Sequence, residues 1–353
     1  MYRVVHCGTG YIGKNMLRLM LQQQHLKLVG QYVSSREKIG KDTGELIGIE
    51  PIGVKATNSW DEVIRLGADV LTYAADSVGR EREAIEDVIP FLEAGTNVVS
   101  ISGWQLGHRA AMPPDLLTRL GAACQKGRSS CYFNACDPGW ATSDLAITTL
   151  GLANRIDSVH LIEFACFAQY PAQYACREYF GFGQPPGFQP LLVRNNIIKQ
   201  MWSPTLHRIA EVLGVEIDDF KVTYETDSVG RDLTVAFGTV KAGTAAVVHF
   251  ELQALRRGRP FITLEHVDTM LPNFTEAGTQ WSKPNYPKSS YRIEVHGDPD
   301  FAVELQAHNT MFNSTPVINC IPALVAAPPG LLTPIDIPRY WSQNVTARRG
   351  PWP

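Results

Sequence analysis

Short apolar runs alternate with segments of helical periodicity along the first third of the chain. Residues 4–7 form a compact apolar run, and Ile12, Met16 and Met20 then recur at helical spacing. Further strands are expected at 28–33, 54–56, 70–74 and 97–101, with helix-like segments at 59–66, 80–93 and 114–126. Such short connections predict an α/β fold, a doubly wound parallel sheet with helices on both faces.

From about residue 158 the pattern changes to longer strands with alternating apolar and polar positions. These strands are expected at 158–165, 220–225, 233–240, 245–255, 261–270, 291–296 and 301–306. Residues 241–244 are expected to connect two of them as a hairpin, and a helix is expected near 197–213. This region is predicted to be an α+β domain with an open, mainly antiparallel sheet.

The change of pattern predicts two domains. Residues 1–140 are expected to form the first, and residues 141–314 the second. Residues 315–345 contain the apolar run 317–327 and are expected to pack back onto the first domain.

Composition excludes several classes of protein. The 353 residues carry 32 Lys and Arg against 35 Asp and Glu, a net charge of −3. Near-neutrality without a basic stripe argues against a nucleic-acid partner. All apolar runs are far shorter than the roughly 20 residues of a membrane span, so no membrane partner is expected. Since the N-terminus enters a strand at once, we expect a cytoplasmic protein.

The seven cysteines form no C-x-x-C pair. They stand at positions 7, 124, 131, 136, 166, 176 and 320. This spacing indicates reduced, mostly buried thiols and no metal site.

A glycine-rich segment joins the first predicted strand to the first predicted helix. It consists of Gly8, Thr9, Gly10, Tyr11, Ile12 and Gly13. In this context G-x-G-x-x-G is typical of dinucleotide binding, because the glycines let the backbone approach a pyrophosphate at a helix N-terminus. The first domain is therefore predicted to bind a dinucleotide.

The end of the second strand bears on which dinucleotide is bound. An NAD site usually places Asp or Glu there, whereas this chain has Ser34, Ser35 and Arg36. Two hydroxyls and a guanidinium suit a 2′-phosphate. Glu37 is close enough to blur the distinction, so we expect NADP(H) to be preferred and NAD(H) to remain possible. Ala74, Ala75 and Ser102, which follow later strands, are expected to complete the cofactor site.

Several segments resemble the dihydrodipicolinate-reductase-like proteins, and within them the 2,4-diaminopentanoate dehydrogenase and NAD(P)H-dependent amine dehydrogenase branch. Besides the glycine-rich segment, the resemblance lies in residues 32–35, 40–46, 70–74, 137–140, 179–185 and 319–323. It therefore spans nearly the whole chain.

The resemblance implies a nicotinamide-dependent oxidoreductase that forms a homodimer through the sheet of its second domain. It also implies hydride transfer to a C=O or C=N carbon, as in reductive amination. By position, Asp137 matches an asparagine that borders the nicotinamide pocket, and Asn319 matches a tail asparagine that returns to the cofactor. One departure matters: the amine dehydrogenases carry a glutamate just after the strand at 97–101, and residues 100–106 here contain no carboxylate.

Four residues are candidates for catalysis. Asp137 follows a strand and precedes a helix, and Glu163 lies in an alternating strand with apolar neighbours. His266 is the most plausible histidine for proton transfer, and Tyr170 stands where the resemblance implies an active-site wall. Each also has a structural reading: a turn aspartate, a solvent-facing glutamate, a hydrogen-bonded sheet histidine and a packed tyrosine.

Three functions follow from these observations. The first is an NADPH-dependent reductase of a small hydrophobic ketone or imine. The aromatic residues at 164–188 and the absence of a basic cluster favour this reading. The second is an amine dehydrogenase in which Glu163 or Asp137 replaces the missing glutamate. The third is a non-catalytic NADP-binding sensor or scaffold.

Overall fold

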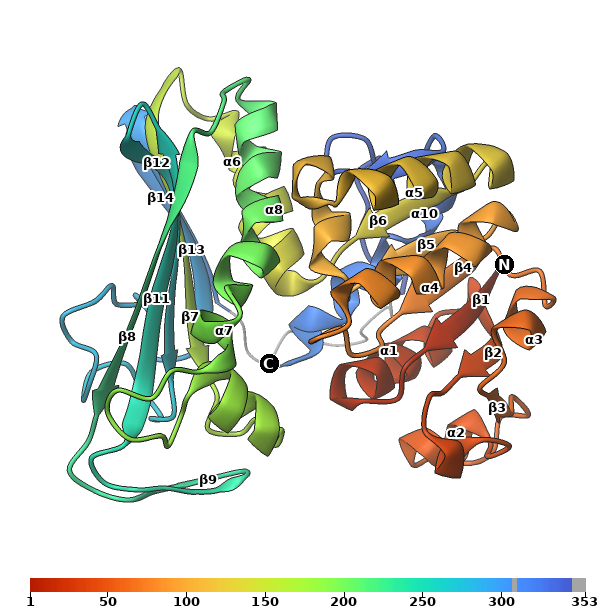
Figure 1. The fold of residues 1–353 in the computed structure, drawn as a ribbon, viewed down its shortest axis with the longest axis horizontal. Coiled ribbons are helices and arrows are strands. Elements are labelled where there is room, and N and C mark those ends of the chain that lie inside the picture. Colours follow the sequence, from red (N-terminus) through yellow and green to blue (C-terminus); the bar gives the residue numbers. More distant parts are fainter. Residues whose placement is uncertain (307–309, 345–353) are drawn as a thin grey trace, which may run out of the picture. The chain divides into compact units, whose positions relative to one another are not determined.

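A computed structural model describes residues 1–306 and 310–344 of the chain (Figure 1). Residue 345, the end of the predicted C-terminal segment, lies outside the described residues. The described part of the chain divides into two compact units. One ends at Cys136 and resumes at Met311, and the other begins at Asp137 and ends at Thr310.

Unit 1 is built on a seven-stranded parallel sheet. Its strand order is β15-β6-β5-β4-β1-β2-β3. The strands are β1 (Tyr2–Cys7), β2 (Leu26–Tyr32), β3 (Ala56–Thr57), β4 (Val70–Tyr73), β5 (Asn97–Ser100), β6 (Ser130–Phe133) and β15 (Gly330–Leu332). The order reverses direction between β1 and β4, and in open parallel sheets ligands bind at the carboxyl ends of the strands at such a point.

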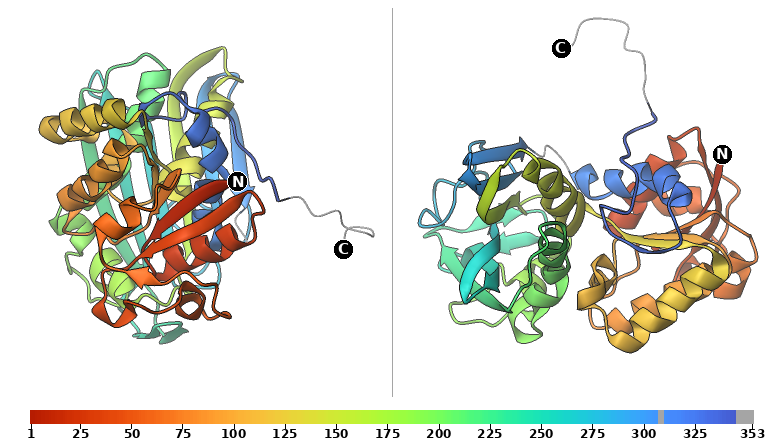
Figure 2. Two further views of the ribbon diagram at one scale, coloured as in Figure 1. Left: turned by 90° about the vertical axis from the view of Figure 1, so that its right-hand side faces the viewer. Right: turned by 90° about the horizontal axis from the view of Figure 1, so that it is seen from above.

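Helices cover both faces of this sheet (Figure 2). The longer ones are α1 (Tyr11–Leu21), α4 (Glu81–Glu93) and α5 (Pro114–Gly127), and the shorter ones are α2 (Thr43–Ile47), α3 (Trp60–Ile64), α9 (Thr315–Asn319) and α10 (Ile321–Ala326). Helices α4 and α5 pack together, and α1 packs against α9. The expected doubly wound α/β fold is confirmed.

The C-terminal segment is part of the unit 1 core. Val317, Ile318, Ile321 and Leu324 are buried in one cluster with apolar residues of α1 and β1. The sequence pattern did not predict β15, which extends the sheet by pairing in parallel with β6.

Unit 2 has a six-stranded sheet in the order β14-β13-β7-β12-β11-β8. The strands are β7 (Arg155–Cys166), β8 (Asp219–Ser228), β11 (Ala245–Arg256), β12 (Arg259–Thr269), β13 (Ser290–Asp298) and β14 (Phe301–Gln306). All neighbours pair antiparallel except β7 and β12, which pair in parallel. The expected open, mainly antiparallel sheet is confirmed.

Helices lie on one face of the unit 2 sheet (Figure 1). Helix α8 (Ile197–Val212) contacts β8, β11 and β12, and α6 (Leu145–Leu150) contacts α8. Helix α7 (Leu191–Arg194) precedes α8. The sequence periodicity had predicted α8 within one residue of its observed ends.

The expected hairpin connection at residues 241–244 is wrong. Strands β9 (Leu233–Val235) and β10 (Gly238–Val240) pair with each other as a separate two-stranded sheet. Strand β11 instead pairs with β8 and β12. The stretch read as one strand reverses at residues 236–237, where Gly238 adopts a φ of +127° that favours glycine. Residues 241–244 therefore link two different sheets.

Candidate functional site

The glycine-rich loop lies at the carboxyl end of β1, at the switch point of the unit 1 sheet. A Cβ on Gly8 would come within 2.4 Å of the Ala74 carbonyl oxygen, and one on Gly13 within 2.6 Å of the Gly8 carbonyl oxygen. A Cβ on Gly10, by contrast, would have no atom within 4 Å. Two glycines thus permit close packing, and the third leaves open space above the start of α1. This arrangement fits a dinucleotide pyrophosphate.

Other predicted cofactor residues adjoin this loop. Ala74 follows β4 and donates its N–H to the Cys7 carbonyl oxygen at 2.8 Å. The Ser102 hydroxyl donates to the Ala75 carbonyl oxygen. The ends of β1, β4 and β5 are therefore linked at one edge of the sheet.

The side chains after β2 are not arranged as expected for a phosphate site. The Ser35 hydroxyl donates to the Glu37 carboxylate at 2.8 Å, and Arg36 is exposed. Lys38, which was not predicted as a cofactor residue, donates from its Nζ to the Thr9 hydroxyl at 3.0 Å. No sequence motif reveals a contact between residues 29 positions apart.

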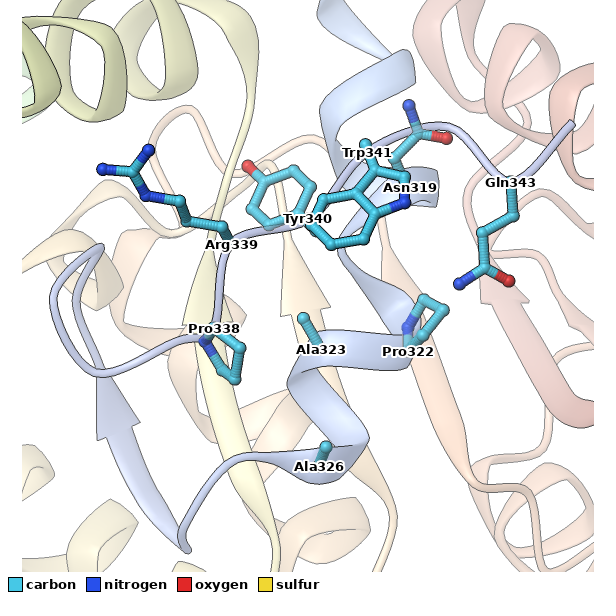
Figure 3. A pocket seen from close by; sticks show the side chains of 9 residues that line it. All are labelled: Asn319, Pro322, Ala323, Ala326, Pro338, Arg339, Tyr340, Trp341 and Gln343. Atoms are coloured by element: carbon cyan, nitrogen blue, oxygen red, sulfur yellow. The ribbon is translucent and has the colours of Figure 1, made fainter. Parts of the chain in front are cut away.

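Asn319 ends α9 and lines a pocket of about 190 Å³ within unit 1. Its walls come from α10 and the C-terminal tail, with Tyr340 and Trp341 standing over Ala323 (Figure 3). None of the lining residues belongs to the glycine-rich loop. The pocket is thus a feature of the C-terminal segment.

Unit 2 brings three of the four catalytic candidates into one buried cluster. His266 Nε2 lies 3.2 Å from Asp137 Oδ2, and His266 Nδ1 lies 3.8 Å from Glu163 Oε2. The parallel register of β7 and β12 pairs Glu163 with His266. The ring of Tyr170 packs edge-on against Phe167 at 5.7 Å, and Phe167 also contacts Phe180 and Phe182.

Three further residues of this cluster were missed by sequence analysis. Asp268 is fully buried, with Oδ2 3.8 Å from His266 Nδ1. Trp202 of α8 donates its indole N–H to Asp137 Oδ2 at 2.6 Å, and the Thr142 hydroxyl donates to Asp137 Oδ1. Only Asp268 carried a usable signal, because residues two apart on a strand share a face.

Asp137 is held by a turn whose backbone departs from helical geometry. Between β6 and α6, residues Asp137, Pro138 and Gly139 are non-helical within the segment Cys136–Asp144. The carboxylate does not serve as a simple cap, since it accepts from Trp202 and Thr142. The turn thus directs Asp137 into the cluster.

Burial and mutual charge set the protonation states of the cluster. Burial lowers the pKa of His266, but Asp137 and Glu163 outweigh it and raise this pKa well above its usual value. Burial and the charge of Asp137 raise the pKa of Glu163 well above its ordinary range. Burial acts against ionised Asp137, but His266 outweighs it and lowers the Asp137 pKa. At neutral pH we therefore assign an imidazolium, an ionised Asp137 and a protonated Glu163.

The pKa of Asp268 is also raised, with burial as the main cause. One imidazolium thus faces three carboxyl groups, more negative charge than it can balance if all ionise. Glu163 is the most exposed of the four, at 12% of its side chain against 2% or less for the others. Glu163 is therefore the member best placed to exchange a proton.

Asp137, Glu163 and His266 could also hold a metal ion. One ligand atom from each lies within 4.8 Å of the others. The same spacing suits a positively charged nitrogen, because carboxylates accept hydrogen bonds from ammonium and iminium groups.

A second histidine-carboxylate cluster lies on the opposite face of the same sheet. Glu265 precedes His266 on β12, so its side chain points the other way. Its carboxylate lies 3.0 Å from His160 Nε2 and 3.1 Å from His249 Nε2, and it accepts from the Ser282 hydroxyl at 2.7 Å. His249, Glu251 and Glu265 also have metal-compatible spacing.

Comparisons with known proteins agree with the resemblance seen in the sequence. The sequence model for the N-terminal domain of dihydrodipicolinate reductase matches residues 2–73, and that for the C-terminal domain of 2,4-diaminopentanoate dehydrogenase matches residues 198–348. An amine dehydrogenase from Streptomyces virginiae is 29% identical over 350 residues, covering 96% of each chain. The chain is thus similar to the dihydrodipicolinate-reductase-like oxidoreductases, and within them to the amine dehydrogenase branch.

Solved structures share the fold of this oxidoreductase. An amine dehydrogenase from Mycobacterium smegmatis matches 97% of this chain and 98% of its own, with a TM-score of 0.78 and 18% identity. A probable dehydrogenase from Thermotoga maritima matches 95% and 92%, with a TM-score of 0.56 and 12% identity. The protein is an NAD(P)-dependent oxidoreductase, as the sequence predicted. Among the described residues, no helix combines the length and apolar character needed to span a membrane.

Proposed function

We propose that the protein is an amine dehydrogenase, which reduces the C=N bond formed from a small hydrophobic ketone and ammonia. The observation that carries this proposal is the excess of carboxyl groups around His266 in unit 2. An iminium nitrogen is positively charged and gains from nearby carboxylates, whereas a neutral ketone does not. The amine dehydrogenase relative supports the same reaction.

The protonation states suggest a role for Glu163. Addition of ammonia to the ketone gives a carbinolamine, whose hydroxyl must take up a proton before it can leave as water. A protonated Glu163 can donate that proton. The products are water and an iminium ion, and the new glutamate carboxylate stabilises that charge. The cofactor supplies the hydride that converts the iminium carbon to the amine. In this scheme Glu163 takes the place of the family glutamate that residues 100–106 lack.

Asp137 and His266 complete the scheme as a supporting pair. Asp137 stays ionised through its contact with His266 and the donors Trp202 and Thr142. The imidazolium of His266 lies between Asp137 and Glu163 and can return a proton to Glu163 after each turnover. The proton is replaced by the one that the ammonium ion loses when it reacts as ammonia. Tyr170 is proposed to contribute to an apolar wall with Phe167.

A ketone panel with and without ammonium tests the reaction. We expect NADPH oxidation to require ammonium and to yield the amine. Ketone reduction to the alcohol without ammonium would replace this proposal with a ketone reductase. NADPH binding without turnover on any carbonyl or imine would leave a cofactor-binding sensor. Excess EDTA should leave the rate unchanged, because the scheme assigns the cluster to a nitrogen cation and not to a metal.

We also propose that NADP(H) is preferred over NAD(H). No Asp or Glu directly follows β2, and Arg36 stands there exposed. Replacing Arg36 with Ala should raise the KM for NADPH far more than the KM for NADH. Equal effects on both cofactors would show that Arg36 does not contribute to this preference.

We further propose a homodimer formed through the unit 2 sheet, located in the cytoplasm. The helices α6 and α8 lie on one face of this sheet. We place the second copy on the opposite face, beside the part that Trp281 and Ser282 cover. All seven cysteines are free, as in a reducing compartment. Light scattering coupled to gel filtration should give twice the 39.0 kDa mass of one chain.

A further inference from the structure

One ammonium group is held directly at the dinucleotide-binding loop. Lys38 ends the short 3-10 turn Arg36–Lys38 that follows β2. Its Nζ donates to the hydroxyl of Thr9, the second residue of the glycine-rich loop, at 3.0 Å. Thr9 is only 7% exposed and Lys38 is half-buried. The contact thus fixes a positive charge between the end of β2 and the loop.

The neighbouring polar groups are less well placed than Lys38 to bind a phosphate beside the loop. Arg36 and Ser34 are exposed, and no side-chain hydrogen bond or ion pair of Arg36 occurs within residues 1–306 and 310–344. The Ser35 hydroxyl is engaged by Glu37, whose carboxylate would repel a phosphate. A cation fixed on the loop side offsets that repulsion. Of the groups in this segment, Lys38 is the one already positioned beside the loop.

We propose that Lys38 binds the 2′-phosphate of NADP(H) and is the main determinant of cofactor specificity, with Arg36 as its exposed partner. An ammonium has three donors, so Lys38 can keep its bond to Thr9 while donating to a phosphate. The adenosine ribose of a bound dinucleotide lies at the carboxyl end of β2, the strand that leads into Lys38. This inference rests on the proposed preference for NADP(H).

Binding of nucleotide fragments to the full-length protein tests the role of Lys38. Dissociation constants are measured for adenosine 2′,5′-bisphosphate and 5′-AMP, and for NADPH and NADH, with the wild type and with Lys38→Met. A hydrogen bond to a charged group contributes about 1.5–3 kcal/mol, so K38M should bind the bisphosphate and NADPH about 10- to 100-fold more weakly. Its binding of AMP and NADH should change by less than about threefold, since neither carries the 2′-phosphate.

Two further variants serve as controls. Lys38→Arg keeps the positive charge and should retain most of the NADPH affinity. Lys41→Met removes an exposed lysine three residues away that has no contact with Thr9 in the described structure, so it should leave the ratio of NADPH to NADH affinity unchanged.

Three results would overturn the proposal. Equal losses for NADPH and NADH in K38M would assign Lys38 to the pyrophosphate or to support of the loop. Unchanged binding in K38M would exclude Lys38 from the phosphate site. The same conclusion would follow if R36A lost the preference for NADPH over NADH and K38M kept it. A wild type that binds NADH as tightly as NADPH refutes the cofactor preference itself, before any variant is made.

Discussion

Two neighbouring residues of β12, Glu265 and His266, lie at the centres of two clusters of opposite character. Around Glu265, two imidazoles and a serine surround one carboxylate. Around His266, three carboxyl groups surround one imidazole. The first set satisfies its buried charge within the protein, and the second does not.

The pKa values express this difference. Burial acts against the ionised Glu265, but hydrogen bonds from His160, His249 and Ser282 outweigh it and lower the Glu265 pKa. Glu163 in the other cluster has a raised pKa, because burial and Asp137 both oppose its ionisation. Hydrogen bonds to an ionised buried carboxylate stabilise a fold, whereas unbalanced buried charge is typical of functional sites. We therefore assign the Glu265 cluster to stability and the His266 cluster to chemistry.

The largest expected effect of a single substitution is on the reaction rate. Glu163→Gln should lower kcat for reductive amination by about 10²-fold or more, because the proposed proton donor is lost. Since the folded pKa of Glu163 is raised, its ionisation opposes folding above about pH 4.5. Glutamine cannot ionise, so the free energy of unfolding at pH 7 should stay the same or rise, as measured by urea denaturation. An active variant of lower stability would reverse our assignment of the two clusters.

The matching substitution in the other cluster should affect stability instead. Glu265→Gln leaves His160 and His249 without their shared carboxylate. Breaking a buried ion pair costs about 3 kcal/mol, so the free energy of unfolding should fall by roughly that amount. The kcat of the folded variant should remain within about threefold of the wild type, since Glu265 is on the opposite face. A variant of normal stability would show that the Glu265 network contributes nothing to folding.

Part of the pH dependence of stability should come from the Glu265 cluster. Burial lowers the pKa of His160, but hydrogen bonds to Glu265 and Glu294 outweigh it and raise this pKa to about 9. A raised folded pKa gives stabilisation that is complete below the unfolded pKa near 6.5 and is lost as the pH rises through about 9. The free energy of unfolding should fall by about 2 kcal/mol, a value reduced to allow for the partial exposure of the His160 ring. Glu265, with a lowered pKa, should lose its contribution only as the pH falls below about 4.5.

Denaturation of His160→Gln at pH 6 and pH 9.5 tests this alkaline limb. The wild type should be less stable at pH 9.5 than at pH 6, and this difference should be smaller in the variant because the contribution of His160 is lost. A variant that keeps the full wild-type slope would place the titrating group elsewhere.

The chain shows clearly what a single sequence can and cannot predict. The alternation of apolar runs predicted both sheets. A strand buried on one face has alternating apolar residues, and a strand buried on both faces is a continuous apolar run. The loop of residues 8–13 was predicted because its chemistry requires consecutive residues. The pairing of Glu163 with His266 depends on the register between β7 and β12, which no local pattern encodes. Lys38 and Trp202 were missed for the same reason, since each acts through a contact between distant segments. Asp268 could have been inferred, because it lies two residues after His266 on the same strand face.

The smallest expected effect comes from the tryptophans that support the two clusters. Trp202→Phe removes the indole N–H that donates to Asp137 but preserves an aromatic ring against Phe250 and His266. A hydrogen bond to a charged group contributes about 1.5 kcal/mol, so its loss should lower kcat/KM roughly tenfold. Because that bond favours ionised Asp137, its loss should also raise the lower apparent pKa of the pH–rate profile.

Trp281 provides the matched control for Trp202. It stacks on His249 at a ring distance of 4.7 Å and donates to Glu225, both on the Glu265 side of the sheet. Trp281→Phe should lower the free energy of unfolding by about 1 kcal/mol, because it loses one largely exposed hydrogen bond while ring stacking is retained. Neither kcat/KM nor the pH–rate profile should change. If Trp281→Phe shifted the profile as much as Trp202→Phe, the two faces of the sheet would be coupled and the division between a stabilising and a reactive cluster would fail.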